Sequence, residues 1–195
     1  MENLIDRIKR INSKYISLYT NLDKILVMRN VNKIPGVIDS EYYEFLKETN
    51  GASILDYCFF GLKNNKLGSN VYNAITDLWL CDNLLTLRFW GVAATSTGEY
   101  FGYLNKENDS GSHFIGFYES NEPGKVYLVA SSFSIFLGKF LTQIEFAISQ
   151  NANALGLNNN DWFLDLNSLV KNDPEMHKYI LEKRGNAEYL STIYE

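Results

Sequence analysis

The sequence predicts an α+β fold, a single domain in which an antiparallel sheet of about four to six strands is covered by helices. Apolar residues recur at helical spacing near both ends of the chain, whereas short aromatic segments separated by turn residues occupy its middle. The aromatic fraction of 14%, with 13 Tyr and 12 Phe, favours a sheet-containing fold over a plain helix bundle. The length of 195 residues fits one domain with further helices at its C-terminal end.

The first 33 residues predict a basic amphipathic helix. Seven basic and three acidic side chains give this segment a net charge of +4. Such a helix could contact a membrane or an acidic partner, but we expect it to dock on its own domain. Residues 24–31 fit no single pattern. The helical face consists of residues three or four positions apart: Leu4, Ile8, Ile11, Tyr15, Leu18 and Leu22.

Residues 34–51 predict a short helix with defined limits. Pro35 disfavours helical backbone before it, and Asp39 or Ser40 can cap the helix that follows. Asn50-Gly51 tolerates the left-handed conformation that ends many helices. The buried face is expected to consist of Tyr42, Phe45, Leu46 and Thr49.

The middle of the chain predicts strands. Gly98 supplies the positive φ that a short hairpin loop needs, and Pro123-Gly124 is typical turn chemistry. Residues 71–87 allow a helix only with a polar interruption at Asp82, and we predict a helix there. The expected strands are residues 53–62, 90–94, 100–104, 113–118 and 125–130.

The strongest helical pattern covers Phe133–Ser149, where a broad apolar stripe must lie against the sheet. Ser131 or Ser132 can cap its first turn. Residues 151–160 are rich in Asn and predict a loop, and the pattern after residue 161 is helical. We therefore expect a domain over residues 1–149 and a helical extension over residues 150–195, packed on that domain.

Residue types that carry out catalysis are scarce. His113 and His177 belong to no metal-binding motif, and Cys58 and Cys81 lie in apolar segments without CxxC spacing. Cys58 and His113 could form a nucleophile–base pair, but core packing of a free, buried thiol explains Cys58 better. The glycines of residues 91–102 match no phosphate-binding motif. We expect no catalytic, cofactor-binding or metal-binding residues.

The charge distribution narrows the class of partner. Residues 34–195 carry 11 basic and 20 acidic side chains, a net charge of −9. Negative charge disfavours nucleic acid and suits a cationic partner, although plain solubility also explains any single acidic residue. The chain has neither a signal-peptide pattern nor a run of about 18 apolar residues. We expect a cytoplasmic protein that binds neither nucleic acid nor membrane.

Four motifs occur in an order that resembles the SUKH superfamily, which includes the yeast cell-wall regulators of the Smi/Knr type. Ile34 replaces the usual Leu of the first motif, Gly36 follows its Pro, and Glu99 stands where Asp is commoner. The resemblance covers roughly residues 1–149. The motifs are Ile34-Pro35 with Tyr42-Tyr43, Phe45-Leu46 and Asn50-Gly51; Phe59-Phe60-Gly61-Leu62; Gly91-Val92-Ala93-Ala94 with Gly98-Glu99-Tyr100-Phe101; and Val129-Ala130-Ser131-Ser132-Phe133 with Phe136-Leu137.

The resemblance implies a single α+β domain without catalytic activity. Bacterial members are mostly immunity proteins that bind a toxin domain, often a nuclease, in the cytoplasm and block it. The acidic body fits such a partner, because nucleases that grip phosphate tend to be basic. An intracellular regulatory or scaffold module of the Smi/Knr type is the alternative. An enzyme with a site that the sequence does not reveal is a third.

A contact surface is expected on the sheet and its loops, where acidic or aromatic residues occupy hairpin and loop positions. Each of these residues is, taken singly, explained as well by an ordinary surface or core position. Nothing in the sequence specifies an oligomeric state. The candidates are Trp90, Glu99, Tyr100, Asp109, Glu119 and Glu122.

Overall fold

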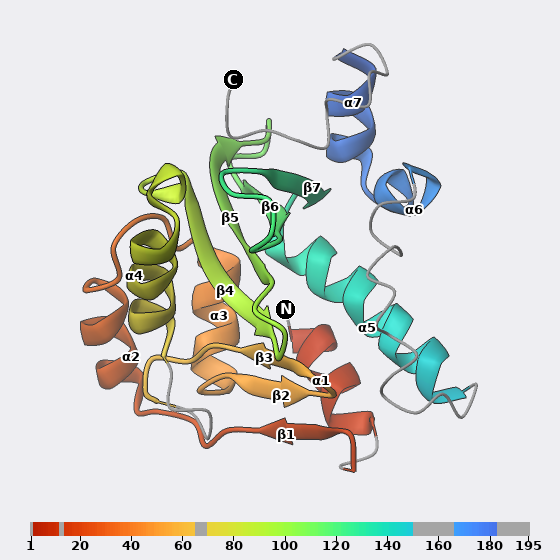
Figure 1. Ribbon diagram of the computed structural model, residues 1–195. Helices are drawn as coiled ribbons and strands as arrows, with labels where there is room; N and C mark the ends of the chain where they lie inside the picture. Colours follow the sequence, from red (N-terminus) through yellow and green to blue (C-terminus); the bar gives the residue numbers. More distant parts are fainter. Residues whose placement is uncertain (1, 12–13, 65–69, 150–165, 183–195) are drawn as a thin grey trace.

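The computed structural model describes residues 2–11, 14–64, 70–149 and 166–182, and Figure 1 shows an α+β fold around one twisted sheet. The sheet is an antiparallel meander of seven strands in the order β1-β2-β3-β4-β5-β6-β7. The predicted class is confirmed, and the strand number is slightly above the four to six expected. The strands are β1 (Ile16–Leu18), β2 (Ala52–Ile54), β3 (Tyr57–Phe59), β4 (Phe89–Thr95), β5 (Tyr100–Glu107), β6 (His113–Tyr118) and β7 (Val126–Ala130).

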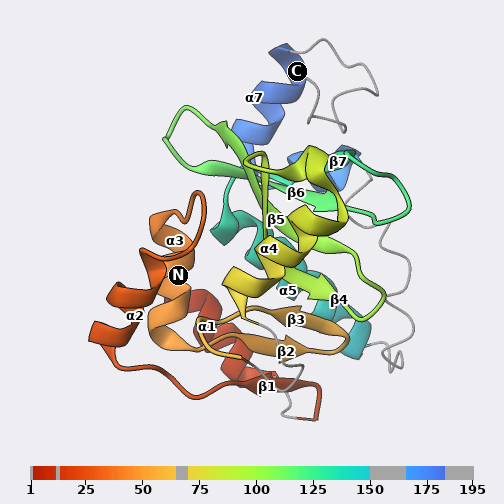
Figure 2. The same ribbon diagram turned by 60° about the vertical axis from the view of Figure 1, so that its left-hand side comes forward.

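Helices cover both faces of the sheet. Figure 2 shows α4 in front of β4 and β5, with α5 behind the sheet. Within the described ranges, no helix is long and apolar enough to cross a membrane. The helices are α1 (Glu2–Arg10), α2 (Lys24–Val31), α3 (Ser40–Glu48), α4 (Val71–Cys81), the 3₁₀ helix η1 (Asn83–Leu85), α5 (Phe133–Ser149), α6 (Leu166–Val170) and α7 (Pro174–Glu182).

The larger core lies between the sheet and helices α3 and α5. Phe101 on β5 packs against Phe117 on β6 and Phe136 on α5, with both ring pairs 4.9 Å apart. Tyr42 on α3 meets Phe133 on α5 at 5.1 Å. This aromatic seam is the buried face that the spacing of residues 42–46 and 133–144 predicts.

A second core lies on the opposite face of the sheet. Its strand residues include Phe89, Leu104 and Phe114, and its cover comes from Leu78 on α4, Leu85 on η1, and Met176 and Ile180 on α7. Helix α7 thus closes a face of the sheet that α5 cannot reach. The boundary predicted between residues 149 and 150 stays a prediction, because residues 150–165 lie outside the described ranges.

The N-terminal segment differs from the prediction of one long helix. Helix α1 ends at Arg10, and Ile16–Leu18 forms an edge strand in which Ile16 pairs with Ile54. Ile16 is buried and Ser17 exposed, which is the two-residue alternation of a strand. The helical spacing of the apolar residues after residue 11 was therefore coincidental.

Two further elements needed the structure to define them. Residues 24–31 form α2, where the Asp23 side chain accepts a hydrogen bond from the backbone N–H of Ile25. The strand expected over residues 53–62 is instead the hairpin β2–β3, which turns at Leu55-Asp56. Leu55 adopts a φ of +52°, although no glycine marks this turn in the sequence.

The segment around Asn50-Gly51 ends α3, as predicted, and it also joins two backbones. Gly51 has a φ of +92°, and a Cβ there would lie 2.4 Å from the carbonyl oxygen of Phe59. The Asn50 side chain accepts hydrogen bonds from the backbone N–H groups of Leu62 and Lys63, at 2.9 and 3.1 Å. Asn50-Gly51 therefore fixes the chain after β3 against the end of α3.

Candidate partner-binding surface

The meander brings three hairpin turns to one end of the sheet. The β2–β3, β4–β5 and β6–β7 turns follow one another across this end, because each pair of strands is antiparallel. Four of the predicted residues, Glu99, Tyr100, Glu119 and Glu122, belong to the second and third turns. The row of strand residues that borders this end is Ile54, Tyr57, Thr95, Tyr100, Tyr118 and Val126.

This end of the sheet, the acidic end, also includes Asp56, which the sequence prediction missed. Asp56 is exposed in the β2–β3 turn, next to Tyr57, which pairs with Thr95. It was missed because residues 53–62 were read as one uninterrupted strand. The acidic end therefore carries Asp56, Glu99, Glu119 and Glu122.

The carboxylate of Glu99 is held in place by its own turn. The hydroxyls of Thr95 and Thr97 both donate hydrogen bonds to Oε2 of Glu99. Gly98, between Thr97 and Glu99, has a φ of +94°, as the hairpin prediction required. Glu99 thus presents an oriented acceptor and keeps its second oxygen for other donors.

Glu122 is fixed in a similar way in the β6–β7 turn. It accepts a hydrogen bond from the Tyr127 hydroxyl, and its carboxylate lies 3.2 Å from the ammonium of Lys125. These two donors lower the pKa of Glu122. Glu122 is therefore an anion at neutral pH, although Lys125 neutralises part of its field.

Asp82, which lies between α4 and η1, also holds the β6–β7 turn in place. This buried carboxylate accepts hydrogen bonds from the backbone N–H of Gly124 at 2.5 Å and from the Tyr118 hydroxyl at 3.1 Å. It also caps η1 through the N–H of Leu84. The sequence showed Asp82 only as a polar residue that interrupts a helix. Its role in the turn could not be predicted, because Gly124 lies 42 residues away in the chain.

Trp90 is a correction to the predicted surface. It is only 3% exposed and packs at 6.4 Å against Trp79, while a Cβ on Gly36 would lie 1.5 Å from its indole nitrogen. Its cross-strand partner is Tyr103, which belongs to the buried face of β5. This register places Trp90 in the core. Tyr100 is half-buried.

Asp109 lies in the β5–β6 turn, at the end of the sheet opposite the acidic end. Its carboxylate forms an ion pair with Lys178 of α7. A second contact from the same helix joins Tyr179 to Lys106, whose ammonium lies 2.7 Å from the tyrosine hydroxyl. Asp109 thus contacts the chain's own C-terminal helix.

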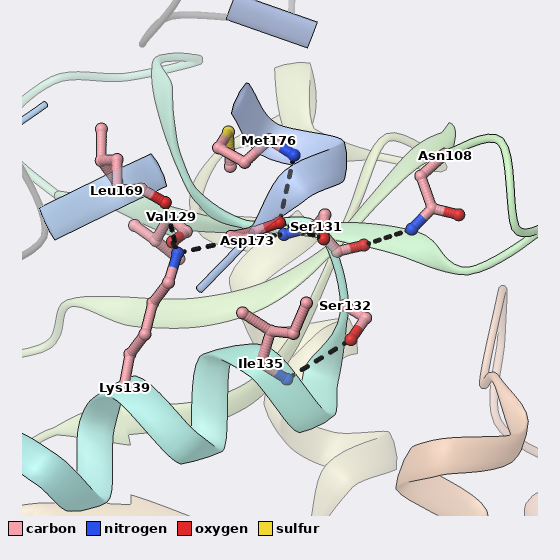
Figure 3. A network of polar contacts seen from close by, with 9 residues as sticks. All are labelled: Asn108, Val129, Ser131, Ser132, Ile135, Lys139, Leu169, Asp173 and Met176. Carbon is pink, nitrogen blue, oxygen red and sulfur yellow. Dashed lines mark hydrogen bonds and ion pairs between the residues drawn. The ribbon is translucent and has the colours of Figure 1, made fainter. Parts of the chain in front are cut away.

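A buried polar network attaches α7 to the rest of the domain, and Figure 3 shows it around Asp173. Asp173 is 1% exposed and accepts hydrogen bonds from the backbone N–H and hydroxyl of Ser131. It also accepts one from the N–H of Met176, which caps α7, and one from the Lys139 ammonium at 3.0 Å. Lys139 donates further to the carbonyls of Val129 and Leu169, and burial lowers its pKa.

The described residues contain no group of three or more His, Cys, Asp and Glu side chains that could hold a metal ion. His113 is 8% exposed, and its Nε2 lies 3.6 Å from Glu107. Both cysteines are free, as expected, but only Cys58 is buried, and Cys81 is exposed at the end of α4.

The partly buried carboxylate of Asp39 has a shifted pKa. Burial raises the pKa of Asp39, against the effect of hydrogen bonds from the Tyr103 hydroxyl and from the first turn of α3. Asp39 caps α3 through the N–H groups of Glu41 and Tyr42. This arrangement gives Asp39 a structural task at the start of the aromatic seam.

Comparison with known proteins matches the chain to a family. No curated protein and no solved structure matches the chain. The SUKH_6 family, described as SMI1-KNR4 cell-wall, matches residues 32–137, which is more than half of the 195 residues. The match runs from the segment before α3 to the first turns of α5. It thus spans β2 to β7 and every one of the four sequence motifs. The protein is therefore a member of the SUKH superfamily, in its SMI1-KNR4 branch.

Proposed function

We propose that this protein is an immunity protein, which binds a cognate toxin domain in the cytoplasm and neutralises it without catalysis. The observation that carries the proposal is the acidic end of the sheet, a set of carboxylates on neighbouring turns of a SUKH domain. The expected partner is a basic domain such as a nuclease. Neither a cofactor nor a nucleic acid takes part.

The fixed carboxylates favour tight recognition of a basic surface. Glu99 is oriented by two threonine hydroxyls and Glu122 by Tyr127 and Lys125, so binding would immobilise few side chains. Carboxylates accept charge-assisted hydrogen bonds from Lys and Arg, and their field speeds association with a cationic domain. Occupation of a toxin's substrate-binding surface would then block the toxin sterically.

A regulatory or scaffold module is the second candidate, and the description of the matching family as SMI1-KNR4 cell-wall favours it. Such a module would bind a host protein and would protect no cell from a toxin. The two functions are therefore separated by a toxicity assay.

The experiment is co-expression of the protein with the toxin domain encoded by the adjacent gene, followed by calorimetry of the purified pair. We expect rescue of growth and a stable complex. Changing Glu99, Glu119 and Glu122 together to Lys should weaken binding at least about tenfold. The steepness of the unfolding transition should stay the same. In the control, which has the same change in net charge, three exposed glutamates on α3 and α7 are changed to Lys: Glu44, Glu48 and Glu182.

Two results would count against the proposal in different ways. An absence of both rescue and binding would reject the immunity function. Rescue by the Glu99, Glu119 and Glu122 variant at wild-type affinity would keep the function but remove the acidic end as its contact surface.

A further inference from the structure

A cavity of about 310 Å³ lies between α1, β7, α5 and the end of α6. Its lining includes Arg7 from α1, Val129 from β7, Thr142 from α5 and Lys171 from the segment that follows α6. Sites for small molecules in proteins are concave and measure about 300–1,000 Å³. The cavity is therefore large enough for a small organic ligand, and it shares no residue with the acidic end.

The inner wall of the cavity is apolar. Val129 and Leu169 line it although each is only 1% exposed, and Ile135 adds a third aliphatic side chain. Figure 3 shows Val129 and Leu169 next to the Lys139 ammonium, which binds their backbone carbonyls. Water has few polar partners against aliphatic side chains, whereas a hydrocarbon group gains free energy by burial there. The inner wall thus suits an apolar ligand group.

The charged residues of the lining are all basic. Arg7, Lys139 and Lys171 line the cavity, and the described residues of its lining include neither Asp nor Glu. This concentration of positive charge occurs in a chain whose net charge is −5. A cavity lined in this way favours an anionic ligand over a neutral or a cationic one.

The ion pairs around the cavity indicate how much negative charge the ligand carries. Glu145 lies 2.8 Å from Arg7, and Asp173 lies 3.0 Å from Lys139, so two of the three basic groups have a carboxylate partner. Lys171 forms no ion pair with another described residue. One positive charge is therefore left without a partner, which matches a monoanion better than a phosphate dianion.

The hydrogen-bond donors indicate where the anionic group binds. The Lys139 ammonium already donates to two carbonyls and to Asp173, so it has no proton left for a ligand. Arg7 uses Nε and Nη2 to bind Glu145 and Thr142, which leaves the N–H groups of Nη1. Because these contacts already hold the guanidinium in place, binding through Arg7 costs little side-chain entropy. Arg7 and Lys171 are thus the available cationic donors.

We propose that this cavity binds a small monocarboxylate with an apolar body. The carboxylate is bound by Arg7 and Lys171, and the apolar body lies against Val129, Ile135 and Leu169. The volume corresponds to about ten waters at roughly 30 Å³ each, so a ligand of about ten non-hydrogen atoms fits. Because the lining comes from α1, α5 and the end of α6, such a ligand also joins the C-terminal helices to the domain. The inference does not depend on a toxin.

The test is isothermal titration calorimetry of the full chain with octanoate, which has about ten non-hydrogen atoms. Octanamide is the neutral probe of the same size. We expect one octanoate to bind per chain, at least about tenfold more tightly than octanamide. Lys171→Gln should weaken octanoate binding at least about tenfold and leave octanamide binding unchanged. The matched control Lys24→Gln removes an exposed lysine of α2 and should change neither affinity.

A second variant fills the cavity without disturbing the fold. Gly138 lines the cavity from the interior of α5, and the nearest atom to a Cβ there is in the Leu4 side chain, at an ordinary contact distance of 3.8 Å. Glycine is also unfavourable inside a helix. We therefore expect Gly138→Leu to abolish octanoate binding while its melting temperature without ligand stays the same or rises.

The proposal would be overturned if octanoate did not bind, or if it bound no more tightly than octanamide. Wild-type affinity for octanoate in Lys171→Gln or in a folded Gly138→Leu would equally reject it, because octanoate would then bind elsewhere on the protein.

Discussion

Replacement of Asp173 by Asn tests whether the buried network holds α7 to the domain. The carboxylate accepts four hydrogen bonds, two from Ser131 and one each from Lys139 and Met176. An amide of the same size has only one acceptor oxygen, and its NH₂ group would face donors. The Lys139 ammonium would keep its two carbonyl partners but lose the negative charge beside it.

The expected cost is large because both partners are buried. The side chain of Asp173 is 0% exposed and that of Lys139 13%. Removing one member of a buried ion pair costs about 3–5 kcal/mol, since the other charge stays uncompensated. Against a typical total stability of about 5–15 kcal/mol, this would unfold the protein or detach α7.

Urea denaturation followed by circular dichroism measures the effect. The control Asp109→Asn removes an aspartate that also binds α7, but the Asp109–Lys178 pair is exposed and screened by solvent, so its loss should change stability little. Lys139→Met in the Asp173→Asn background should recover part of the loss, by about 1–3 kcal/mol. The reasoning is refuted if Asp173→Asn and Asp109→Asn cost the same.

The pH dependence of the variant gives an independent check of the same prediction. Burial lowers the pKa of Lys139 in the folded state, and loss of the carboxylate would lower it further. The unfolded state then binds more protons as the pH approaches the ordinary lysine value of about 10.4, so stability rises with pH. We expect the deficit of Asp173→Asn to shrink in that range, and a constant deficit would contradict the role of Lys139.

Three further predictions concern the core. Gly51→Ala should cost at least about 2 kcal/mol in urea denaturation, because Gly51 has a φ of +92° and a Cβ would lie 2.4 Å from the Phe59 carbonyl. Asn50→Ala should cost about 1–3 kcal/mol, since two backbone N–H groups lose their acceptor; a neutral result would mean that water replaces it. Burial and the Asp39 charge raise the pKa of Tyr103, so the folded state keeps a proton that the unfolded state loses above about pH 10. Stability should fall there by up to about 1.4 kcal/mol per pH unit, and Tyr103→Phe should remove that part of the slope.

The sheet could be predicted from local signals wherever glycine or proline marks a turn. The β4–β5 and β6–β7 hairpins were predicted from Gly98 and Gly124, which adopt φ values of +94° and +70°. The β2–β3 hairpin carries no such residue, because Leu55 takes the left-handed position itself. A sequence pattern cannot show a strained leucine, so one long strand was predicted instead of two short ones.

The candidate surface was predicted only in part, since its members depend on register and on distant partners. That Glu99 and Glu122 share one end follows from the alternation of antiparallel strands, which the sequence did predict. Trp90 was wrongly placed because its pairing with Tyr103 decides its face. The Asp173 network escaped prediction for a similar reason, as Ser131 and Asp173 are 42 residues apart.

The C-terminal helix bears on where a partner can bind. The family match ends at residue 137, before Lys139 and all of α6 and α7. In this chain α7 covers the second face of the sheet with Met176 and Ile180, and its Lys178 pairs with Asp109. The end of the sheet at the β5–β6 turn is thus partly covered by α7. At the acidic end, the carboxylates of Glu99 and Glu122 contact residues of their own turns and strands. A basic partner would therefore reach Glu99 and Glu122 without displacing α7, while at Asp109 it would have to displace Lys178 first.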